Sequence, residues 1–245
     1  GSIPMSERAK MVVCADGRTH GTIGGGCLEA EVLAVARDVL ESGRPHSTRY
    51  TMTEQQAGAH GLNCGGTVRI YTECIDAEAS ELCAEIARAK QERRPCVLAT
   101  VLDGGGRALF HADGSRQGQL GGTDPEVVTS WAAQALERER PDLQQLSGAE
   151  VFVEPFAPPP QLYVFGGGHV GAQICRLAHN VGFRVVVVDD RPYFAGRDRH
   201  PDADECIVDE IAAVFDRIPI DDQTYIVAAT RGHEHDEVVV ERAIA

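Results

Sequence analysis

The sequence lacks the features that mark membrane, secreted and nucleic-acid-binding proteins. No apolar run approaches the ~20 residues of a transmembrane helix, and no charged segment followed by an apolar one marks a secretory leader. Basic residues are scarce, because 23 Lys and Arg stand against 37 Asp and Glu, a formal net charge of −14. A chain this acidic repels a phosphate backbone. We therefore expect no nucleic-acid partner, no membrane association and a cytoplasmic location.

Several motifs of metal and hydrolytic sites are also missing. The eight cysteines include no C-x-x-C pair, which disfavours a zinc ribbon or a thioredoxin-like site. Neither a serine-hydrolase elbow, an H-E-x-x-H sequence nor a Walker A sequence is present. The 245 residues are 43% hydrophobic and 24% charged, as in ordinary globular proteins, and the length suits one or two domains.

Three consecutive prolines at 158–160 form the one clear break in the pattern. Prolines cannot continue a helix or a central strand, so this segment is expected to be a stiff connector. The pattern before it, strands and hairpin turns with a few helices, predicts an α/β domain with a mixed sheet over residues 1–157. The strand–helix alternation after it predicts a Rossmann-like parallel-sheet domain over residues 158–245.

A G-x-G-x-x-G motif lies at Gly166, Gly168 and Gly171, between a predicted strand and a predicted helix. In that context the glycines allow a tight turn, and the helix N-terminus offers N–H groups to a phosphate. Asp189 or Asp190 ends the next strand about 20 residues later, where an acceptor for a ribose hydroxyl belongs. A Rossmann-like unit whose glycines serve only packing is the alternative.

Further polar candidates accompany this motif. His169, inside the glycine turn, is either a ligand-binding residue or a helix-entry residue without a chemical role. The segment 230–236 follows the fourth strand of the second domain, at the edge where open α/β sheets bind ligands. There, Arg231 is a candidate partner for an anion and His233 a candidate metal ligand. The alternative is that the histidines are solvated and Asp236 caps a helix.

A second glycine-rich loop precedes a cysteine in the first domain. Gly24, Gly25 and Gly26 lead directly into Cys27, where a helix is predicted to begin. Such a loop exposes N–H groups to an anion, and a helix N-terminus lowers the pKa of a cysteine. Cys27 is therefore a candidate nucleophile, sulfur carrier or soft-metal ligand. Cys64 stands beside two glycines in a similar setting. A small buried thiol in a tight turn is the alternative for both.

Over its whole length the chain resembles the xanthine dehydrogenase accessory factor family, XdhC/CoxI. The resemblance rests most specifically on the string Gly-Gly-Gly-Cys-Leu-Glu at residues 24–29. It continues in the segments 64–66, 165–170, 187–192 and 230–236. Members of this family are expected to continue with further elements beyond Ala245.

The resemblance implies a protein that binds molybdenum cofactor, a molybdenum-bearing pterin with a phosphate. Such proteins protect the cofactor while an oxo ligand is exchanged for sulfide, and then deliver it to a xanthine dehydrogenase-type molybdenum hydroxylase. A cysteine desulfurase is the implied sulfur source, and a cytoplasmic homodimer is the implied state. In this interpretation the glycine motif holds a phosphate, and Cys27 and Cys64 face the molybdenum–sulfur chemistry, so that one guest spans both glycine loops.

Two other functions remain open on the residues alone. The glycine motif with Asp189 also suits an NAD(P)-dependent oxidoreductase, although no His–Asp or Tyr–Lys pair stands out as a proton relay. A thiol-based redox or metal sensor built on Cys27, Cys64 and His233 is the third hypothesis.

Overall fold

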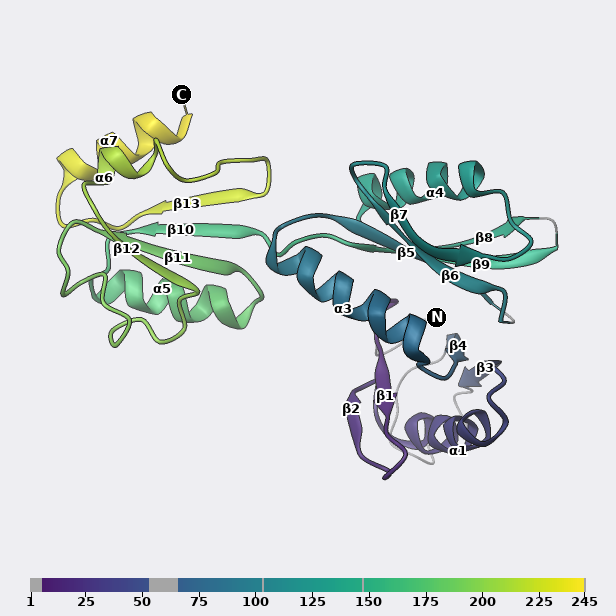
Figure 1. The fold of residues 1–245 in the computed structure, drawn as a ribbon. Coiled ribbons are helices and arrows are strands. Elements are labelled where there is room, and N and C mark those ends of the chain that lie inside the picture. The colour runs from purple at the N-terminus through teal and green to yellow at the C-terminus, as the bar shows by residue number, and fades with distance from the viewer. Residues whose placement is uncertain (1–5, 53–65, 103, 147, 245) are drawn as a thin grey trace. The chain divides into compact units, whose positions relative to one another are not determined.

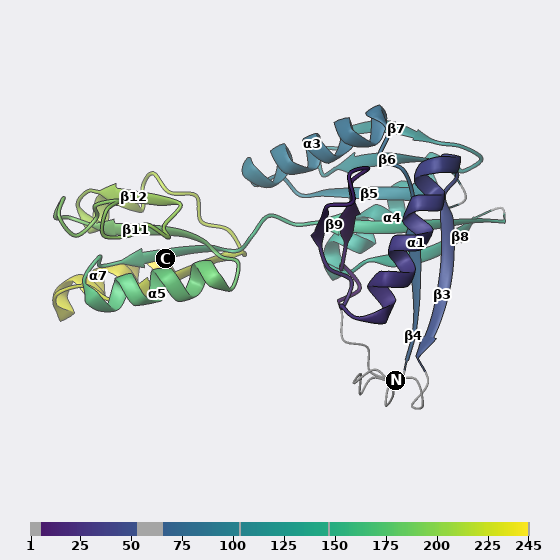
Figure 2. The same ribbon diagram turned by 90° about the horizontal axis from the view of Figure 1, so that it is seen from below.

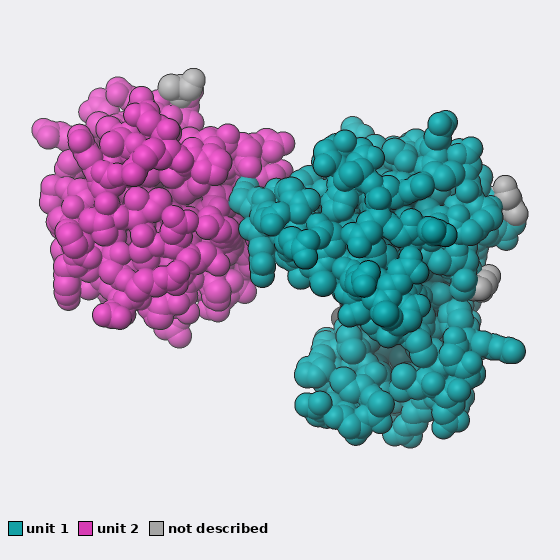
Figure 3. All heavy atoms as spheres, in the orientation of Figure 1, with its two compact units in different colours: residues 1–158 teal, residues 159–245 magenta. Residues whose placement is uncertain are grey.

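The computed structural model of the protein describes residues 6–52, 66–102, 104–146 and 148–244. The chain forms two compact units, Gly1–Pro158 and Pro159–Ala245 (Figure 3). Helices and strands occur in both units (Figure 1), so the α/β fold class is confirmed. Within the described ranges, no helix is both long enough and apolar enough to cross a bilayer.

Among its described residues, unit 1 begins with one helix and two antiparallel strand pairs. The elements in chain order are β1 (Met11–Val13), β2 (Thr19–Gly21), α1 (Cys27–Ser42), β3 (His46–Met52) and β4 (Gly66–Thr72). β1 pairs with β2, and β3 pairs with β4. Leu28 and Val32, one helical turn apart, are buried with Ile23 against Val68 and Ile70. This apolar stripe fixes α1 along β3 and β4 (Figure 2).

The rest of unit 1 is a five-stranded sheet with a helix on each face (Figure 1). Its elements are α3 (Ala77–Gln91), β5 (Cys96–Val101), β6 (Gly106–His111), β7 (Arg116–Leu120), α4 (Pro125–Arg138), β8 (Asp142–Leu146) and β9 (Ala149–Phe156). Alternate residues of β5 face opposite sides: Val97 and Ala99 pack with α4, whereas Cys96 packs with Leu82 of α3.

The prediction of a mixed sheet in this domain is wrong in that detail. The strand order is β7-β6-β5-β9-β8, and every neighbouring pair among the described strands is antiparallel. Short turns join β5 to β6, β6 to β7 and β8 to β9. Two strands joined by so short a turn pair antiparallel, because a parallel pair needs a long crossover.

Unit 2 is a doubly wound parallel sheet, as the Rossmann-like prediction expects. Its elements are β10 (Gln161–Phe165), α5 (His169–Asn180), β11 (Arg184–Asp189), β12 (Glu205–Val208), α6 (Ile211–Val214), β13 (Thr224–Ala228) and α7 (His233–Ile244). The order is β12-β11-β10-β13, with all pairs parallel. Leu162 and Val164 face α5, whereas Tyr163 and Phe165 face α6 and α7.

The strand order of unit 2 reverses at β10. The chain passes from β10 to β11 on one side and later returns to β13 on the other. Ligands of open α/β sheets bind at such a switch point, beyond the carboxyl ends of the strands. The segments that leave β10 and β13 there contain the glycine motif and residues 230–236.

Candidate functional site

The glycine motif after β10 combines two packing glycines with one that borders open space. A Cβ added at Gly166 (φ 112°) would lie 2.1 Å from the Ala229 carbonyl oxygen. One added at Gly171 would lie 1.9 Å from the Gly166 carbonyl oxygen. A Cβ at Gly168, by contrast, would meet no atom within 4 Å. The packing interpretation therefore fits Gly166 and Gly171 but leaves Gly168 without a packing role.

The N-terminus of α5 carries no side-chain cap. Gly168 is the N-cap residue, and its own lack of a side chain leaves the first-turn N–H groups without a local acceptor. His169, the first helical residue, is exposed. Together with the positive end of the helix dipole, this end of α5 favours an anion in the space in front of Gly168.

Asp189 at the end of β11 is buried and bound entirely within the protein. Its Oδ2 accepts from the Gly167 N–H at 2.9 Å, and its two oxygens accept from the Arg191 N–H, Nε and Nη2 at 2.9–3.0 Å. Burial by itself raises the pKa of Asp189, but the hydrogen bonds from Arg191 and Gly167 outweigh it and lower the pKa. The ionised carboxylate thus ties the glycine loop to Arg191.

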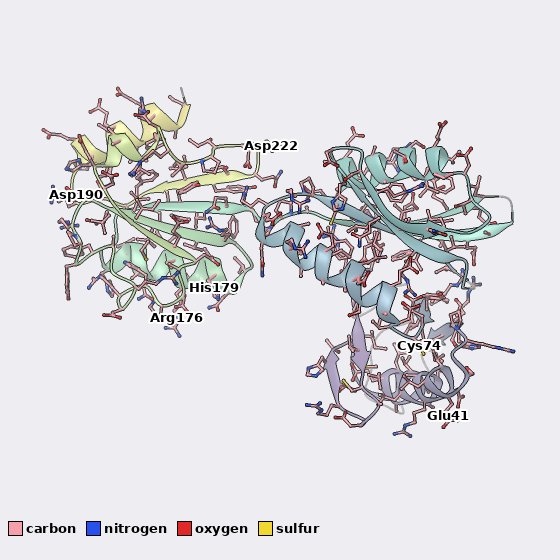
Figure 4. All side chains as sticks on the ribbon, in the orientation of Figure 1. Glu41, Cys74, Arg176, His179, Asp190 and Asp222 are labelled. Atoms are coloured by element: carbon pink, nitrogen blue, oxygen red, sulfur yellow. The ribbon has the colours of Figure 1, made fainter. Side chains whose placement is uncertain are left out.

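Asp190 and Arg231 form an ion pair at the same sheet edge. The Arg231 Nη2 lies 2.9 Å from the Asp190 Oδ2. Figure 4 labels Asp190 at this carboxyl edge, at the opposite end of unit 2 from Asp222. The predicted acceptor Asp190 and the predicted anion partner Arg231 are thus brought together and partner each other.

The loop after β13 is stabilised by Asp236. The Asp236 Oδ1 accepts from the Thr230 hydroxyl at 2.6 Å and from the Thr230 N–H at 3.1 Å, and these bonds lower the pKa of Asp236. His233, the first residue of α7, is exposed. In the described part of the chain, no three or more His, Cys, Asp or Glu side chains form a group that could hold a metal ion. Metal binding by His233 stays a prediction.

The segment 191–200, which follows β11, also lies at this edge, although no sequence motif marks it. The Arg199 Nε donates to the Gly167 carbonyl oxygen at 2.9 Å. His200 is buried, and its Nε2 lies 2.7 Å from the Phe194 carbonyl oxygen. A Cβ at Gly167 would lie 1.9 Å from that same oxygen. The sequence does hold a hint, because three arginines and two adjacent aromatics fall within nine residues of an acidic chain.

The glycine triplet of unit 1 folds around a carboxylate of its own helix. Gly24, Gly25 and Gly26 all have positive φ, at 115°, 74° and 70°. The Glu29 Oε1 accepts from the Thr22 hydroxyl at 2.6 Å and from the N–H groups of residues 23 and 25 at 3.2 Å. These hydrogen bonds, the Thr22 one foremost, lower the pKa of Glu29. The anion that this loop holds is therefore the side chain of Glu29.

The two predicted functional cysteines are described only in part. Gly26 is the N-cap of α1, without a side-chain cap, and the backbone of Cys27 begins the helix as the sequence predicts. Cys64 lies outside the described residues. The roles of both thiols, and the idea of one guest spanning both glycine loops, stay predictions.

Two family models match the chain. The model of the XdhC and CoxI family matches residues 1–51, and that of the XdhC Rossmann domain matches residues 162–245. Together these matches span more than half of the sequence. The chain belongs to the XdhC/CoxI family. The glycine triplet with Cys27 lies in the first match, and the edge formed by the glycine motif, Asp189 and Arg231 lies in the second.

The chain is also similar to individual proteins. A protein of Bacillus subtilis named as a probable xanthine dehydrogenase subunit is 23% identical over 247 residues, which cover 98% of this chain and 72% of that protein. An uncharacterized Escherichia coli protein, YqeB, is 37% identical over 71 residues, which are 29% of this chain and 13% of YqeB. The crystal structure of a xanthine dehydrogenase from Bacillus halodurans has the same fold, with a TM-score of 0.83 and 23% identity over 99% of this chain and 70% of that one.

Proposed function

We propose that this XdhC/CoxI chain is an accessory protein that binds molybdenum cofactor as cargo for a xanthine dehydrogenase-type molybdenum hydroxylase. Family membership and the name of the Bacillus subtilis relative support the accessory role. In the finer part of the proposal, the protein assists sulfuration of the cofactor and its insertion into the hydroxylase. A cysteine desulfurase is then the second partner, and the working form is a homodimer.

The open space in front of Gly168 is the observation that carries this proposal. The pterin of the cargo bears a phosphate, and an uncapped helix N-terminus at the switch point of a parallel sheet suits a phosphate. A side chain at Gly168 would fill the space where that phosphate belongs. The N–H donors of the loop are held in place by Asp189, so little conformational order is lost when an anion binds.

The thiols are assigned to the metal end of the cargo. Thiolate is a soft ligand and suits a molybdenum that is already bonded to sulfur. Cys27 follows a loop whose shape is fixed by Glu29, and its place at the start of α1 favours the thiolate. Cys64 is the second candidate thiol. The chain supplies backbone donors and thiols, and the cargo supplies the molybdenum chemistry.

Retention of released cofactor and activation of a cofactor-free hydroxylase test the proposal. Wild-type protein is expected to retain cofactor through rapid gel filtration and to raise hydroxylase activity. Cys27→Ser is expected to lose at least ten-fold in both. Cys83→Ser is the matched control, because Cys83 is an exposed thiol on α3. Equal cofactor retention and equal hydroxylase activation by the two variants would show that Cys27 has no role in the function. Failure of wild-type protein to retain cofactor would overturn the proposal.

An NAD(P)-dependent oxidoreductase is the second candidate, because the doubly wound sheet and the glycine loop also suit a dinucleotide. However, both carboxylates that could accept a hydrogen bond from a ribose hydroxyl already have partners within the protein. Asp189 holds Gly167 and Arg191, and Asp190 is paired with Arg231. Titration with NADH and NADPH decides between the candidates. Micromolar binding with substrate-dependent turnover would favour the oxidoreductase.

A further inference from the structure

Arg199 differs from Arg191 and Arg231, two other arginines at the carboxyl edge of unit 2. Arg191 and Arg231 form ion pairs with Asp189 and Asp190. Arg199 is half-buried, and no carboxylate among the described residues lies within 4 Å of its guanidinium nitrogens. Its hydrogen bond to the Gly167 carbonyl oxygen uses Nε and leaves the two terminal nitrogens available.

The guanidinium of Arg199 is also fixed in position. Its Nε is anchored on the glycine loop, and its central carbon lies 5.2 Å from the ring centroid of Phe194 and 5.5 Å from that of Tyr193. A planar fork held in this way is suited to bidentate binding of a phosphate, because few rotamers are lost on binding. Arg199 therefore offers a positioned positive charge beside the glycine loop, without an ion pair to any described residue.

Tyr193 offers an aromatic surface next to this charge. Its side chain is 73% exposed, although the turn that carries it is held by hydrogen bonds from the N–H groups of residues 194 and 195 to the Arg191 carbonyl oxygen. The ring meets Phe194 edge to face, at 5.3 Å between centroids and 88° between planes. Arg191 in turn lies 3.7 Å from the Phe194 ring centroid. An exposed aromatic on a fixed turn is a stacking surface for a flat ligand.

We propose that Arg199 and Tyr193 form a recognition pair for a planar nitrogen heterocycle that carries a phosphate. The terminal nitrogens of Arg199 bind the phosphate, and the ring of Tyr193 stacks on the heterocycle. The identity of the heterocycle as the pterin of molybdenum cofactor rests on the proposed function. A nicotinamide dinucleotide shares the same chemistry, so the experiment contains an arm for each source.

Arg199→Gln is the decisive variant, because the glutamine amide nitrogen stands at the same position along the side chain as the arginine Nε. It can keep the bond to the Gly167 carbonyl oxygen while removing the charged fork. Arg176→Gln is the matched control, since Arg176 is an exposed arginine on α5 (Figure 4). Tyr193→Ala removes the stacking surface, and Tyr193→Phe retains it. Unchanged thermal midpoints verify that each variant is folded.

Binding of released molybdenum cofactor, NADH and inorganic phosphate is measured for each protein. Wild-type protein is expected to bind one of the heterocyclic ligands. Arg199→Gln is expected to raise the dissociation constant for that ligand at least ten-fold, as is typical for loss of a charge-assisted hydrogen bond. Arg176→Gln should stay within two-fold of wild type. Tyr193→Ala should raise the dissociation constant for the heterocyclic ligand by about five-fold or more, without changing that for inorganic phosphate. Tyr193→Phe should bind the heterocyclic ligand as tightly as wild type.

The outcomes separate this inference from the proposed function. Binding of NADH but not of cofactor, with the expected variant effects, would support the recognition pair and refute the cofactor proposal. Binding of cofactor with Arg199→Gln equal to Arg176→Gln, or with Tyr193→Ala equal to wild type, would overturn the recognition pair alone. Failure of wild-type protein to bind either heterocyclic ligand would overturn both.

Discussion

Replacement of Asp189 by asparagine should destabilise unit 2 by releasing the glycine loop. The carboxylate is 3% exposed and accepts from Gly167 and Arg191. Removing one partner of a buried ion pair costs about 3–5 kcal/mol. The Arg191 side chain is 32% exposed, so water regains part of that loss. We therefore expect about 2–4 kcal/mol of lost unfolding free energy, which lowers the melting midpoint of a unit of this size by at least ~8 °C.

The single tryptophan of the chain allows this effect to be assigned to one unit. Trp131 lies on α4 in unit 1, so its fluorescence reports the unfolding of unit 1, whereas far-ultraviolet circular dichroism reports both units. Asp189→Asn should shift a circular dichroism transition and leave the Trp131 transition in place. Asp222→Asn, at an exposed aspartate of unit 2 (Figure 4), is the control. A variant as stable as this control would refute the structural role of Asp189.

The pH dependence of the same comparison has a defined sign. The pKa of Asp189 is lowered in the folded protein. A lowered carboxyl pKa contributes stability above the unfolded pKa of about 3.9, and this contribution is lost as the pH falls through the folded value. The stability difference between wild type and Asp189→Asn should therefore be constant from pH 7 to about pH 5 and shrink below about pH 4. A difference that grows on acidification would contradict this assignment.

The packing of the glycine loops and the burial of the thiols can be tested by urea unfolding, hydrogen exchange and alkylation. Gly171→Ala should lower the free energy of unfolding by at least ~3 kcal/mol, because its Cβ would overlap the preceding turn. Gly168→Ala should change the free energy of unfolding by about 1 kcal/mol or less. Equal urea midpoints for the two variants would contradict this packing. Glu29→Gln should speed hydrogen exchange at the amides of Ile23 and Gly25, which donate to the carboxylate, and unchanged protection of these two amides would refute the role of Glu29 in holding that loop. At pH 8, iodoacetamide should modify Cys83 but not Cys175 in the native protein, since burial raises the pKa of Cys175 to about 11; equal labelling rates would disprove this.

The sequence predicts best those elements whose pattern is local. The strands β10 and β11 are short apolar runs, and α1 ends where Gly43 adopts the left-handed conformation. The outer strands β7 and β8 are not predicted, because they lie at the sheet edges and their residues are mostly polar. Gly118 within β7 suggests a turn by itself, yet a Cβ there would lie 2.4 Å from the Arg107 carbonyl oxygen of the neighbouring strand.

The candidate site is predictable in its motifs but not in its pairings. The glycine spacing correctly places the turn between β10 and α5, because that motif encodes a backbone shape. The bond between Asp189 and Gly167 and the pairing of Asp190 with Arg231 depend on how separate loops meet, which no local pattern specifies. For the same reason, the sequence does not reveal Glu29 as the carboxylate held by the glycine triplet, nor Arg199 as a neighbour of the glycine motif.

Mass spectrometry of the small molecule that co-purifies with the protein, combined with molybdenum analysis, tests the central claim most directly. The protein is purified from cells that synthesise molybdenum cofactor, without added metal or nucleotide. The proposed function predicts a phosphate-bearing pterin together with molybdenum. A nicotinamide dinucleotide without pterin or molybdenum would contradict it.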